Sequence, residues 1–418
     1  MVKSKLDYFV DIKDDSFTLS LPDKKSRTWE NLFQLLDDLN NDSSHFNSRD
    51  DICTPMKCVK KMIDYIPEDF WLKKDIKILD PCCGNGNFGA YCLTKTSIEN
   101  IYFNDINEKR IKKCIELLNP KYISNIDALK IEGSYDLIMA NPPYSGGGNK
   151  NKSLSNLFIE KGIDLLNEKG YLCYITPNNW MSFNNNNNTL KRLLNEGSFL
   201  VIDNDAKKYF PQVGSSFTIF IWQKGVFDNK TTVFNNFLVK DIQTNVLISK
   251  ELKFLPLYIS NEILEICLKT IGKKRNSFNY RCDLHNHTKS SFLKDIQDSE
   301  FKYKTIHTPN ITRYASIKQD IYEKWLIIVP LSNFYKPYIV SKSNTTQSVG
   351  YFAFDSENDA QKYLKKITEP LYKLLIHITR YGNFNNISVL KYLLFDENIK
   401  LNKNQENKIN KLISFLKY

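Results

Sequence analysis

The sequence predicts an α/β domain with a mostly parallel sheet, followed by a mixed α+β part of nearly two hundred residues. Between residues 76 and 224, short apolar runs typical of buried strands alternate with helix-like segments. After residue 225 this alternation stops. We expect there strand-like runs at 325–329 and 349–354 and helices at about 356–378 and 402–417. The charge balance changes at the same place. Residues 1–224 carry 29 basic and 29 acidic residues, and the rest carry 58 − 29 = 29 basic and 47 − 29 = 18 acidic, so the whole formal excess of +11 lies in the second part.

These observations divide the chain into an N-terminal helical extension (1–50), an α/β domain (51–225) and a basic domain (226–418). Hydrophobic residues make up 42% and charged residues 25%, as in soluble globular proteins. The chain has no run of 18 apolar residues, and the N-terminus lacks the apolar core of a signal peptide. We therefore expect a cytoplasmic protein without a membrane contact, whose nine cysteines are free thiols.

The first expected elements are two helices. Apolar residues at 29, 32, 33 and 36 have helical spacing, and we interpret this helix as a lid or packing element. A second helix is expected over 56–66. Thr54 is the expected N-cap of this helix, with Pro55 in its first turn.

A glycine-rich loop follows the first expected strand of the α/β domain, at 76–79. It reads Asp80-Pro81-Cys82-Cys83-Gly84-Asn85-Gly86-Asn87-Phe88-Gly89, and its glycines match G-x-G-x-x-G between a strand and a helix. Glycines at such positions let the main chain approach a nucleotide-like ligand closely. Asp105 ends a second expected strand at 101–104, where a carboxylate can hold ribose hydroxyls. Asp127 follows a third, at 123–126.

A tetrapeptide, Asn141-Pro142-Pro143-Tyr144, follows the apolar run 135–140. The side-chain oxygen of Asn141 and the carbonyl oxygen of Pro142 are hydrogen-bond acceptors, and the ring of Tyr144 offers a face for stacking. Such a set suits a flat ring that carries an amino group. Prolines after a strand can also simply end it.

These residues together resemble the S-adenosylmethionine-dependent amino-methyltransferases, specifically the DNA adenine-N6 group. The resemblance covers roughly residues 50–225. The segment from Asp80 to Phe88 is similar to the family's cofactor loop. Thr54-Pro55 is similar to the segment that caps the methionine end of the cofactor. The tetrapeptide matches the catalytic motif, and Phe210-Pro211-Gln212 resembles the late motif whose aromatic residue stacks on the target base. The cofactor motifs come first, the catalytic motif second and the recognition region last, which is the gamma-class order of restriction-modification enzymes. Ala128 departs from the pattern, because many relatives have an aromatic residue there.

The resemblance implies a Rossmann-like methyltransferase domain and a C-terminal target-recognition domain. It implies that S-adenosylmethionine is the cofactor and that a flipped-out adenine of duplex DNA receives the methyl group. The implied catalytic residues are Asn141, Pro142 and Tyr144, with Tyr144 and Phe210 stacking on the base. The implied cofactor residues are Thr54, Asp80, Gly84, Gly86, Phe88, Asp105, Asp127 and Asn141. Asp105 is expected at the ribose and Asp127 at the adenine amine. A restriction endonuclease is a possible partner, and a monomer is favoured.

Several alternatives stay open. An RNA adenine methyltransferase or a protein-glutamine methyltransferase can carry the same tetrapeptide, and an inactive DNA-binding subunit could keep the fold. A dehydrogenase would explain the glycines but not the tetrapeptide. Cys282, His285 and His287 lie close together without a second ligand cluster, so we expect no metal. The candidate residues that face DNA are Lys273, Lys274, Arg275, Arg281, Arg313 and Lys318.

Overall fold

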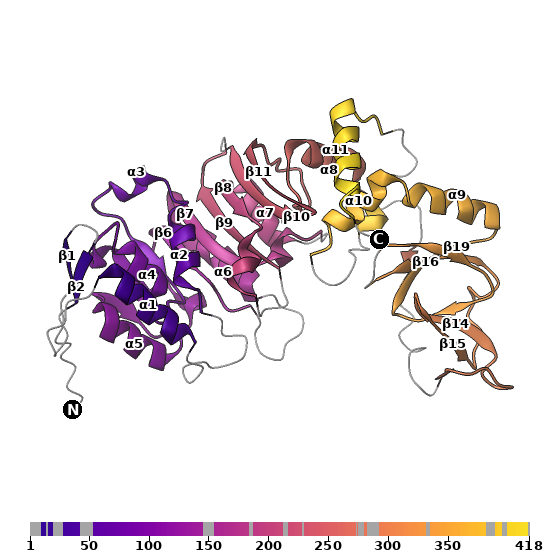
Figure 1. Cartoon of the computed structure of the whole chain (residues 1–418), viewed down its shortest axis with the longest axis horizontal. Helices are drawn as coiled ribbons and strands as arrows, with labels where there is room; N and C mark the ends of the chain where they lie inside the picture. The colour runs from indigo at the N-terminus through magenta and orange to yellow at the C-terminus, as the bar shows by residue number, and fades with distance from the viewer. Residues whose placement is uncertain are drawn as a thin grey trace. The chain divides into compact units, whose positions relative to one another are not determined.

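The computed structural model forms two compact units (Figure 1). The first comprises Met1–Trp180, Asn188–Phe234 and Ile242–Lys250, and the second comprises Met181–Asn187, Asn235–Asp241 and Glu251–Tyr418. The structure describes the chain except for residues 1–9, 14–15, 20–27, 42–52, 145–153, 184–186, 212–215, 228–229, 273, 275–279, 282–291, 332–334, 382–388, 395–398 and 417–418.

A nine-stranded sheet organises the first unit, in the order β11-β10-β8-β9-β7-β6-β3-β4-β5. Its strands are β3 (Ile78–Asp80), β4 (Ile101–Asn104), β5 (Tyr122–Ser124), β6 (Tyr135–Ala140), β7 (Leu166–Pro177), β8 (Gly197–Asp203), β9 (Phe217–Lys224), β10 (Thr231–Phe237) and β11 (Val239–Val246). From β7 to β5 the pairing is parallel, whereas β9 pairs antiparallel with β7 and with β8. The central parallel strands β3 and β6 are buried, as expected for apolar strands that helices cover.

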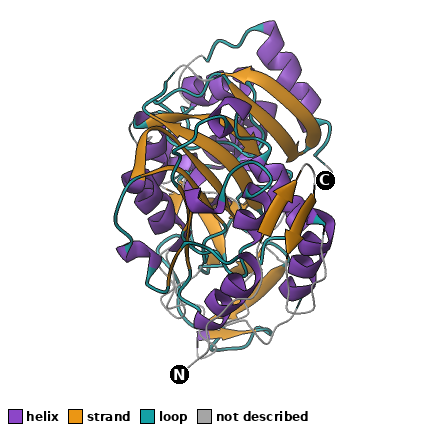
Figure 2. Cartoon of the chain, turned by 90° about the vertical axis from the view of Figure 1, so that its left-hand side faces the viewer, coloured by secondary structure: helices purple, strands orange, loops and turns teal. Residues whose placement is uncertain are grey.

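Helices pack along this sheet (Figure 2). They are α1 (Trp29–Asn40), α2 (Met56–Ile63), α3 (Glu68–Trp71), α4 (Asn87–Cys92), α5 (Glu108–Leu118), α6 (Leu154–Leu165) and α7 (Asn188–Asn195). Two short strands, β1 (Val10–Lys13) and β2 (Ser16–Leu19), pair with each other. Short 3₁₀ turns lie at Ile98–Asn100, Ala128–Lys130, Asn178–Met181 and Ala206–Tyr209. The helices α1, α2 and α4 share one hydrophobic core with the sheet.

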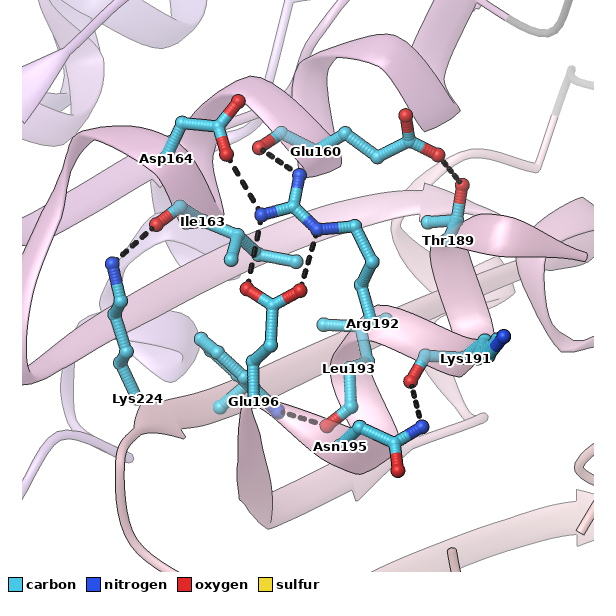
Figure 3. A network of polar contacts seen from close by, with 11 residues as sticks. Glu160, Ile163, Asp164, Thr189, Lys191, Arg192, Leu193, Asn195, Glu196 and Lys224 are labelled. Carbon is cyan, nitrogen blue, oxygen red and sulfur yellow. Dashed lines mark hydrogen bonds and ion pairs between the residues drawn. The ribbon is translucent and has the colours of Figure 1, made fainter. Parts of the chain in front are cut away.

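A polar network ties α6 to α7 (Figure 3). The guanidinium of Arg192 pairs with Asp164 and Glu196 at 2.7 Å each. The hydroxyl of Thr189 donates to Glu160 at 2.6 Å, and the indole N–H of Trp222 donates to the carbonyl of Leu193 at 2.7 Å. The helix α6 is the first described element after the tetrapeptide, and these contacts fix its position next to α7.

The second unit contains two four-stranded sheets and four helices within its described residues. The sheet order is β12-β19-β16-β17 in one and β13-β15-β14-β18 in the other. The strands are β12 (Tyr280–Arg281), β13 (Leu293–Lys294), β14 (Tyr303–Thr308), β15 (Ile311–Ala315), β16 (Trp325–Pro330), β17 (Tyr338–Val340), β18 (Asn344–Thr345) and β19 (Val349–Phe354). The helices are α8 (Asn261–Thr270), α9 (Glu357–Ile367), α10 (Pro370–Ile378) and α11 (Lys403–Ile413), with a 3₁₀ turn at Val389–Tyr392. In the described part of the chain, every helix is too short or too polar to cross a bilayer.

The α/β fold with a mostly parallel sheet and further C-terminal β-sheets is confirmed. Two details of the sequence prediction are wrong. The helix expected over 56–66 ends at Ile63, and its N-cap is Pro55 without a side-chain hydrogen bond, so Thr54 does not cap it. The helix expected at about 356–378 is two helices, because Pro370 lacks an N–H and starts a new one.

Candidate functional site

A cavity of about 420 Å³ opens where the parallel strands of the first unit end. Asp80, at the end of β3, is in register with Phe103 of β4, and Leu79 is in register with Ile138 of β6. Because the carboxyl ends of parallel strands meet at one edge, the loops that follow β3, β4, β5 and β6 converge there. The predicted residues that line the cavity are Thr54, Gly84, Phe88, Asp105, Asp127, Asn141, Pro142 and Tyr144.

The glycine-rich loop forms one wall. Gly84 and Gly86 have φ values of +54° and +93°, which only glycine adopts readily. A Cβ on Gly86 would lie 2.6 Å from Leu118, and one on Gly89 would lie 2.2 Å from the ring of Phe103. Gly86 and Gly89 therefore allow α4 to pack closely on α5 and β4. Gly84 alone of the three glycines lines the cavity.

The carboxylate of Asp105 holds this loop in place. One oxygen accepts a hydrogen bond from the Gly84 N–H at 2.8 Å, and the other accepts from the Asn107 N–H at 2.8 Å. Asp105 lines the cavity and is only 8% exposed. Asp127 also lines the cavity, and it accepts from the Leu129 N–H at 3.0 Å. Both acids thus organise local turns and at the same time present negative charge to the cavity.

Asp80 and Asn85 are buried polar residues of the same loop. Asp80 is fully buried, and neither of its carboxyl oxygens has a hydrogen-bond partner within the described residues. Burial raises the pKa of Asp80 well above its ordinary value, and the negative charge of Asp105 raises it further. Asp80 is not among the residues that line the cavity, whereas its neighbour Pro81 is. The amide of Asn85, which is 2% exposed, likewise has no partner within the described residues.

The tetrapeptide forms the opposite wall. Asn141, Pro142 and Tyr144 line the cavity, and the Tyr144 hydroxyl donates to the side-chain oxygen of Asn141. Burial raises the pKa of Tyr144, so its hydroxyl stays protonated and remains a donor at neutral pH. The ring of Tyr144 packs against Phe217, with 5.3 Å between the ring centroids.

Phe210, the second predicted stacking residue, is buried outside the cavity. It is 3% exposed, packs against Phe217 at 5.2 Å between centroids, and is absent from the cavity lining. The residues directly after Pro211, at 212–215, lie outside the described part of the chain. Phe217 packs against the rings of both Phe210 and Tyr144 and so connects Phe210 to the tetrapeptide.

Several residues that line the cavity were not predicted as site residues, among them Asn85, Ile106, Arg110 and Phe158. Ile106 is apolar but 70% exposed. Its position directly after Asp105, the acid at the end of a strand, was the sequence signal that could have identified it. Arg110 is 6% exposed, and its guanidinium lies 3.5 Å from where a Cβ on Gly84 would be. Phe158 comes from α6, and only the tertiary fold brings it to the cavity.

The predicted DNA-facing residues are scattered. Arg313 pairs with Asp295 at 2.8 Å, and Lys318 pairs with Glu323 at 2.5 Å. Lys274 is exposed, and Arg281 lies in β12. Lys273, Arg275 and the Cys282, His285 and His287 cluster lie outside the described residues. Among the residues that the structure does describe, no cluster of three metal-ligating side chains occurs.

The sequence is similar to known methyltransferases. The profile of the Eco57I restriction-modification methylase family matches residues 10–210. Type II methyltransferase M.HindII of Haemophilus influenzae is 25% identical over 72% of this chain and 69% of its own length. The release factor glutamine methyltransferase of Clostridium botulinum is 28% identical over 32% of this chain and 56% of its own length. The solved structure of the type IIL restriction-modification enzyme MmeI in complex with DNA shares the fold. Its TM-score is 0.53 at 11% identity, over 93% of this chain and 70% of that one.

Proposed function

We propose that this chain is a restriction-modification-type methyltransferase that uses S-adenosylmethionine, and that it methylates the N6 amine of an adenine flipped out of duplex DNA; the similarity to such enzymes supports the proposal. One observation carries the proposal. The Asn141 to Tyr144 tetrapeptide lines the same cavity as the glycine-rich loop and the carboxylates of Asp105 and Asp127. A base amine held by the tetrapeptide would therefore share one enclosed space with the cofactor.

The cavity fits the cofactor in size and in chemistry. A volume of about 420 Å³ lies within the usual range of roughly 300–1,000 Å³ for small-molecule sites. Asp105 and Asp127 can accept hydrogen bonds from ribose hydroxyls and from an adenine amine, and Ile106 and Phe158 offer apolar contact. When bound, S-adenosylmethionine supplies an electrophilic methyl group carried on a sulfonium.

The tetrapeptide orients the amine. The lone pair of an exocyclic adenine amine is delocalised into the ring, which makes the nitrogen a weak nucleophile. Acceptors at the side-chain oxygen of Asn141 and at the carbonyl of Pro142 can take both amine hydrogens, so that the lone pair turns out of the ring plane. These oxygens also stabilise the positive charge that develops on the nitrogen. This arrangement needs no strong general base, because the proton can leave after the transfer.

Access to the amine requires base flipping. The amine cannot be aligned with a methyl donor inside a stacked duplex, so the adenine must leave the helix. The ring of Tyr144, which lines the cavity, can then stack on the base, a contact of about 1–3 kcal/mol. We also propose Phe210 for stacking, although its burial against Phe217 equally suits a packing role.

The basic second part of the chain is proposed to hold the duplex. The formal excess of +11 lies after residue 224, and lysines and arginines bind phosphates through charge and counterion release. The DNA sequence that this part would read is a property of side chains in a groove. A cognate restriction endonuclease is proposed as a partner.

Methyl transfer from labelled S-adenosylmethionine to duplex DNA, RNA and protein tests the proposal. We expect label in the N6-methyladenine of duplex DNA. Asn141→Ala should abolish transfer while cofactor binding, measured by calorimetry, persists. Near-normal turnover of Asn141→Ala would refute the catalytic assignment. Label in RNA alone would identify an RNA methyltransferase, and DNA binding without any transfer would identify an inactive subunit.

A protein-glutamine methyltransferase is the second candidate. The similarity to the release factor glutamine methyltransferase of Clostridium botulinum favours it, because both an amide and an adenine amine are planar N–H donors that suit the tetrapeptide. The basic second part argues against it. Label on a glutamine of a protein substrate, with none in DNA, would establish this alternative.

A further inference from the structure

Helix α1 is bonded to a segment that lines the cofactor cavity. Asp37 accepts a hydrogen bond from the main-chain N–H of Met56 at 2.8 Å. The amide nitrogen of Asn40 donates to the carbonyl of Thr54 at 3.3 Å and to Asp37 at 3.4 Å. Thr54 lines the cavity and is 5% exposed. Two side chains of α1 thus hold the main chain on both sides of Pro55.

Asn87 extends this network to the glycine-rich loop. Its amide nitrogen lies 3.0 Å from the carbonyl of Thr54 and 3.2 Å from the side-chain oxygen of Asn40. Asn87 begins α4, lines the cavity and is 5% exposed. Asn40 therefore contacts two separate segments of the cavity wall at the same time. The two segments are thus joined both by the direct hydrogen bond from Asn87 to Thr54 and through the side chain of Asn40.

The start of α2 explains why this support is needed. The first N–H groups of a helix have no partner within the helix. Pro55 occupies the N-cap position and has no side-chain group that could accept a hydrogen bond from them. The carboxylate of Asp37 supplies the missing acceptor from another helix, at the N–H of Met56. The position of α2, and of Thr54 just before it, thus depends on α1.

Packing keeps α1 itself in place. Leu32 and Leu36 are fully buried in the core of the first unit. The ring of Phe33 packs against Tyr91 of α4, with 5.7 Å between the centroids. This apolar face positions α1 against α4, and Asp37 and Asn40 connect that position to the cavity wall. The helix expected from the sequence to be a lid or packing element has a polar edge directed at Thr54 and Asn87.

We propose that Asp37 and Asn40 are positioning residues for the cofactor, which set the affinity for its methionine end through Thr54 and Asn87. The inference rests on the proposed cofactor site and on the resemblance of Thr54-Pro55 to the segment that caps the methionine end. No hydrogen bond of this network involves Asp105 or Asp127, the carboxylates assigned to the ribose and the adenine. The effect of the network is therefore confined to one end of the cofactor.

Two ligands separate the ends of the cofactor. S-adenosylhomocysteine keeps the amino-acid end, and 5′-methylthioadenosine keeps the nucleoside but lacks that end. Calorimetry on the full chain should show that Asn40→Ala lowers the affinity for S-adenosylhomocysteine by about 3- to 30-fold. This is the loss expected for one or two hydrogen bonds. The affinity for 5′-methylthioadenosine should stay within about twofold, which is within the spread of such measurements.

Two further variants control for general damage. Gln34 lies on the exposed side of the same helix, and among the described residues its side chain donates to Asp38 at 2.9 Å. Gln34→Ala should therefore leave the affinities for both ligands unchanged. Asp37→Ala should act like Asn40→Ala, whereas Asp37→Asn keeps an acceptor oxygen for the Met56 N–H and should restore most of the affinity. If the alanine variants fail to fold, Asp37→Asn still tests the proposal, because this variant should fold and bind S-adenosylhomocysteine.

Equal weakening of both ligands by Asn40→Ala, or an unchanged affinity for S-adenosylhomocysteine in a folded Asn40→Ala protein, would overturn the inference. A loss of S-adenosylhomocysteine binding in Asp37→Asn as large as in Asp37→Ala would overturn it as well. If the unmodified chain bound neither ligand, the proposed function itself would fail, which is a distinguishable result.

Discussion

The buried carboxyl group of Asp80 gives the protein a pH-dependent stability that Asp80→Asn should remove. Asp80 is 0% exposed, and its oxygens have no hydrogen-bond partner within the described residues. Burial raises its pKa, and so does the negative charge of Asp105. The folded state therefore favours the neutral carboxylic acid more than the unfolded chain does.

The sign and size of the effect follow from proton binding. In the unfolded chain the carboxyl has its ordinary pKa of about 3.9. Between that value and the raised pKa of the folded state, the native protein holds a proton that the unfolded chain has released. The free energy of unfolding then falls by about 1.4 kcal/mol for each pH unit of increase. Below pH 3.9 both states are protonated, and the effect vanishes.

Urea denaturation of the wild type and of Asp80→Asn at pH 5, 6, 7 and 8 measures how the free energy of unfolding depends on pH in each protein. Tryptophan fluorescence reports mainly the first unit, which holds Trp29, Trp71, Trp180 and Trp222, whereas Trp325 lies in the second unit. All other titrating groups occur in both proteins, so they largely cancel in the difference. The advantage of Asp80→Asn should grow as the pH rises. A difference that stays constant from pH 5 to 8 would show that Asp80 ionises normally.

Three further predictions follow from single contacts. Gly89→Ala should lower the free energy of unfolding by at least about 1–3 kcal/mol in urea, because its Cβ would lie 2.2 Å from Phe103. Tyr144→Phe removes the hydroxyl that occupies the oxygen of Asn141 and should lower the KM for DNA by about 2- to 10-fold. A raised KM would contradict this. Lys274→Gln, at an exposed candidate DNA-facing position, should reduce the salt slope of DNA binding by about 0.9 in anisotropy titrations. Lys318→Gln should change it less, because Glu323 already pairs with Lys318.

Strands with apolar runs were predictable from the sequence because burial alone determines them. The runs at 101–104, 135–140 and 349–354 match β4, β6 and β19. Helix ends were less predictable. The pattern of α2 continued past Ile63, where the helix ends, and its capping acceptor came from Asp37, which is 19 residues away in the sequence. A local sequence rule cannot detect a cap that another helix supplies.

Some residues of the candidate site could likewise be predicted from the sequence, and others could not. Asp105 and Asn141 directly follow strands of the parallel part of the sheet, and Asp127 follows another such strand after two residues. They could be predicted because the fold brings the ends of these strands to one edge. The contributions of Arg110 and Phe158 come from the sides of α5 and α6. Their sequence patterns do not distinguish them from ordinary helix residues, so only tertiary packing shows that they line the cavity.

The unpartnered polar groups of the glycine-rich loop point to the same function as the motif does. A buried polar group without a partner costs about 1–3 kcal/mol, and a loop selected for stability alone would replace it with an apolar residue. Asp80 and Asn85 nevertheless lie within six residues of each other in this loop, whereas the equally buried Asn87 has its amide bonded to Asn40 and Thr54. Local rules of this kind are broken mainly at functional sites. Asn85 lines the cavity, so a ligand there can supply the partner that its amide lacks among the described residues, and without that ligand the buried amide lowers the stability of the protein.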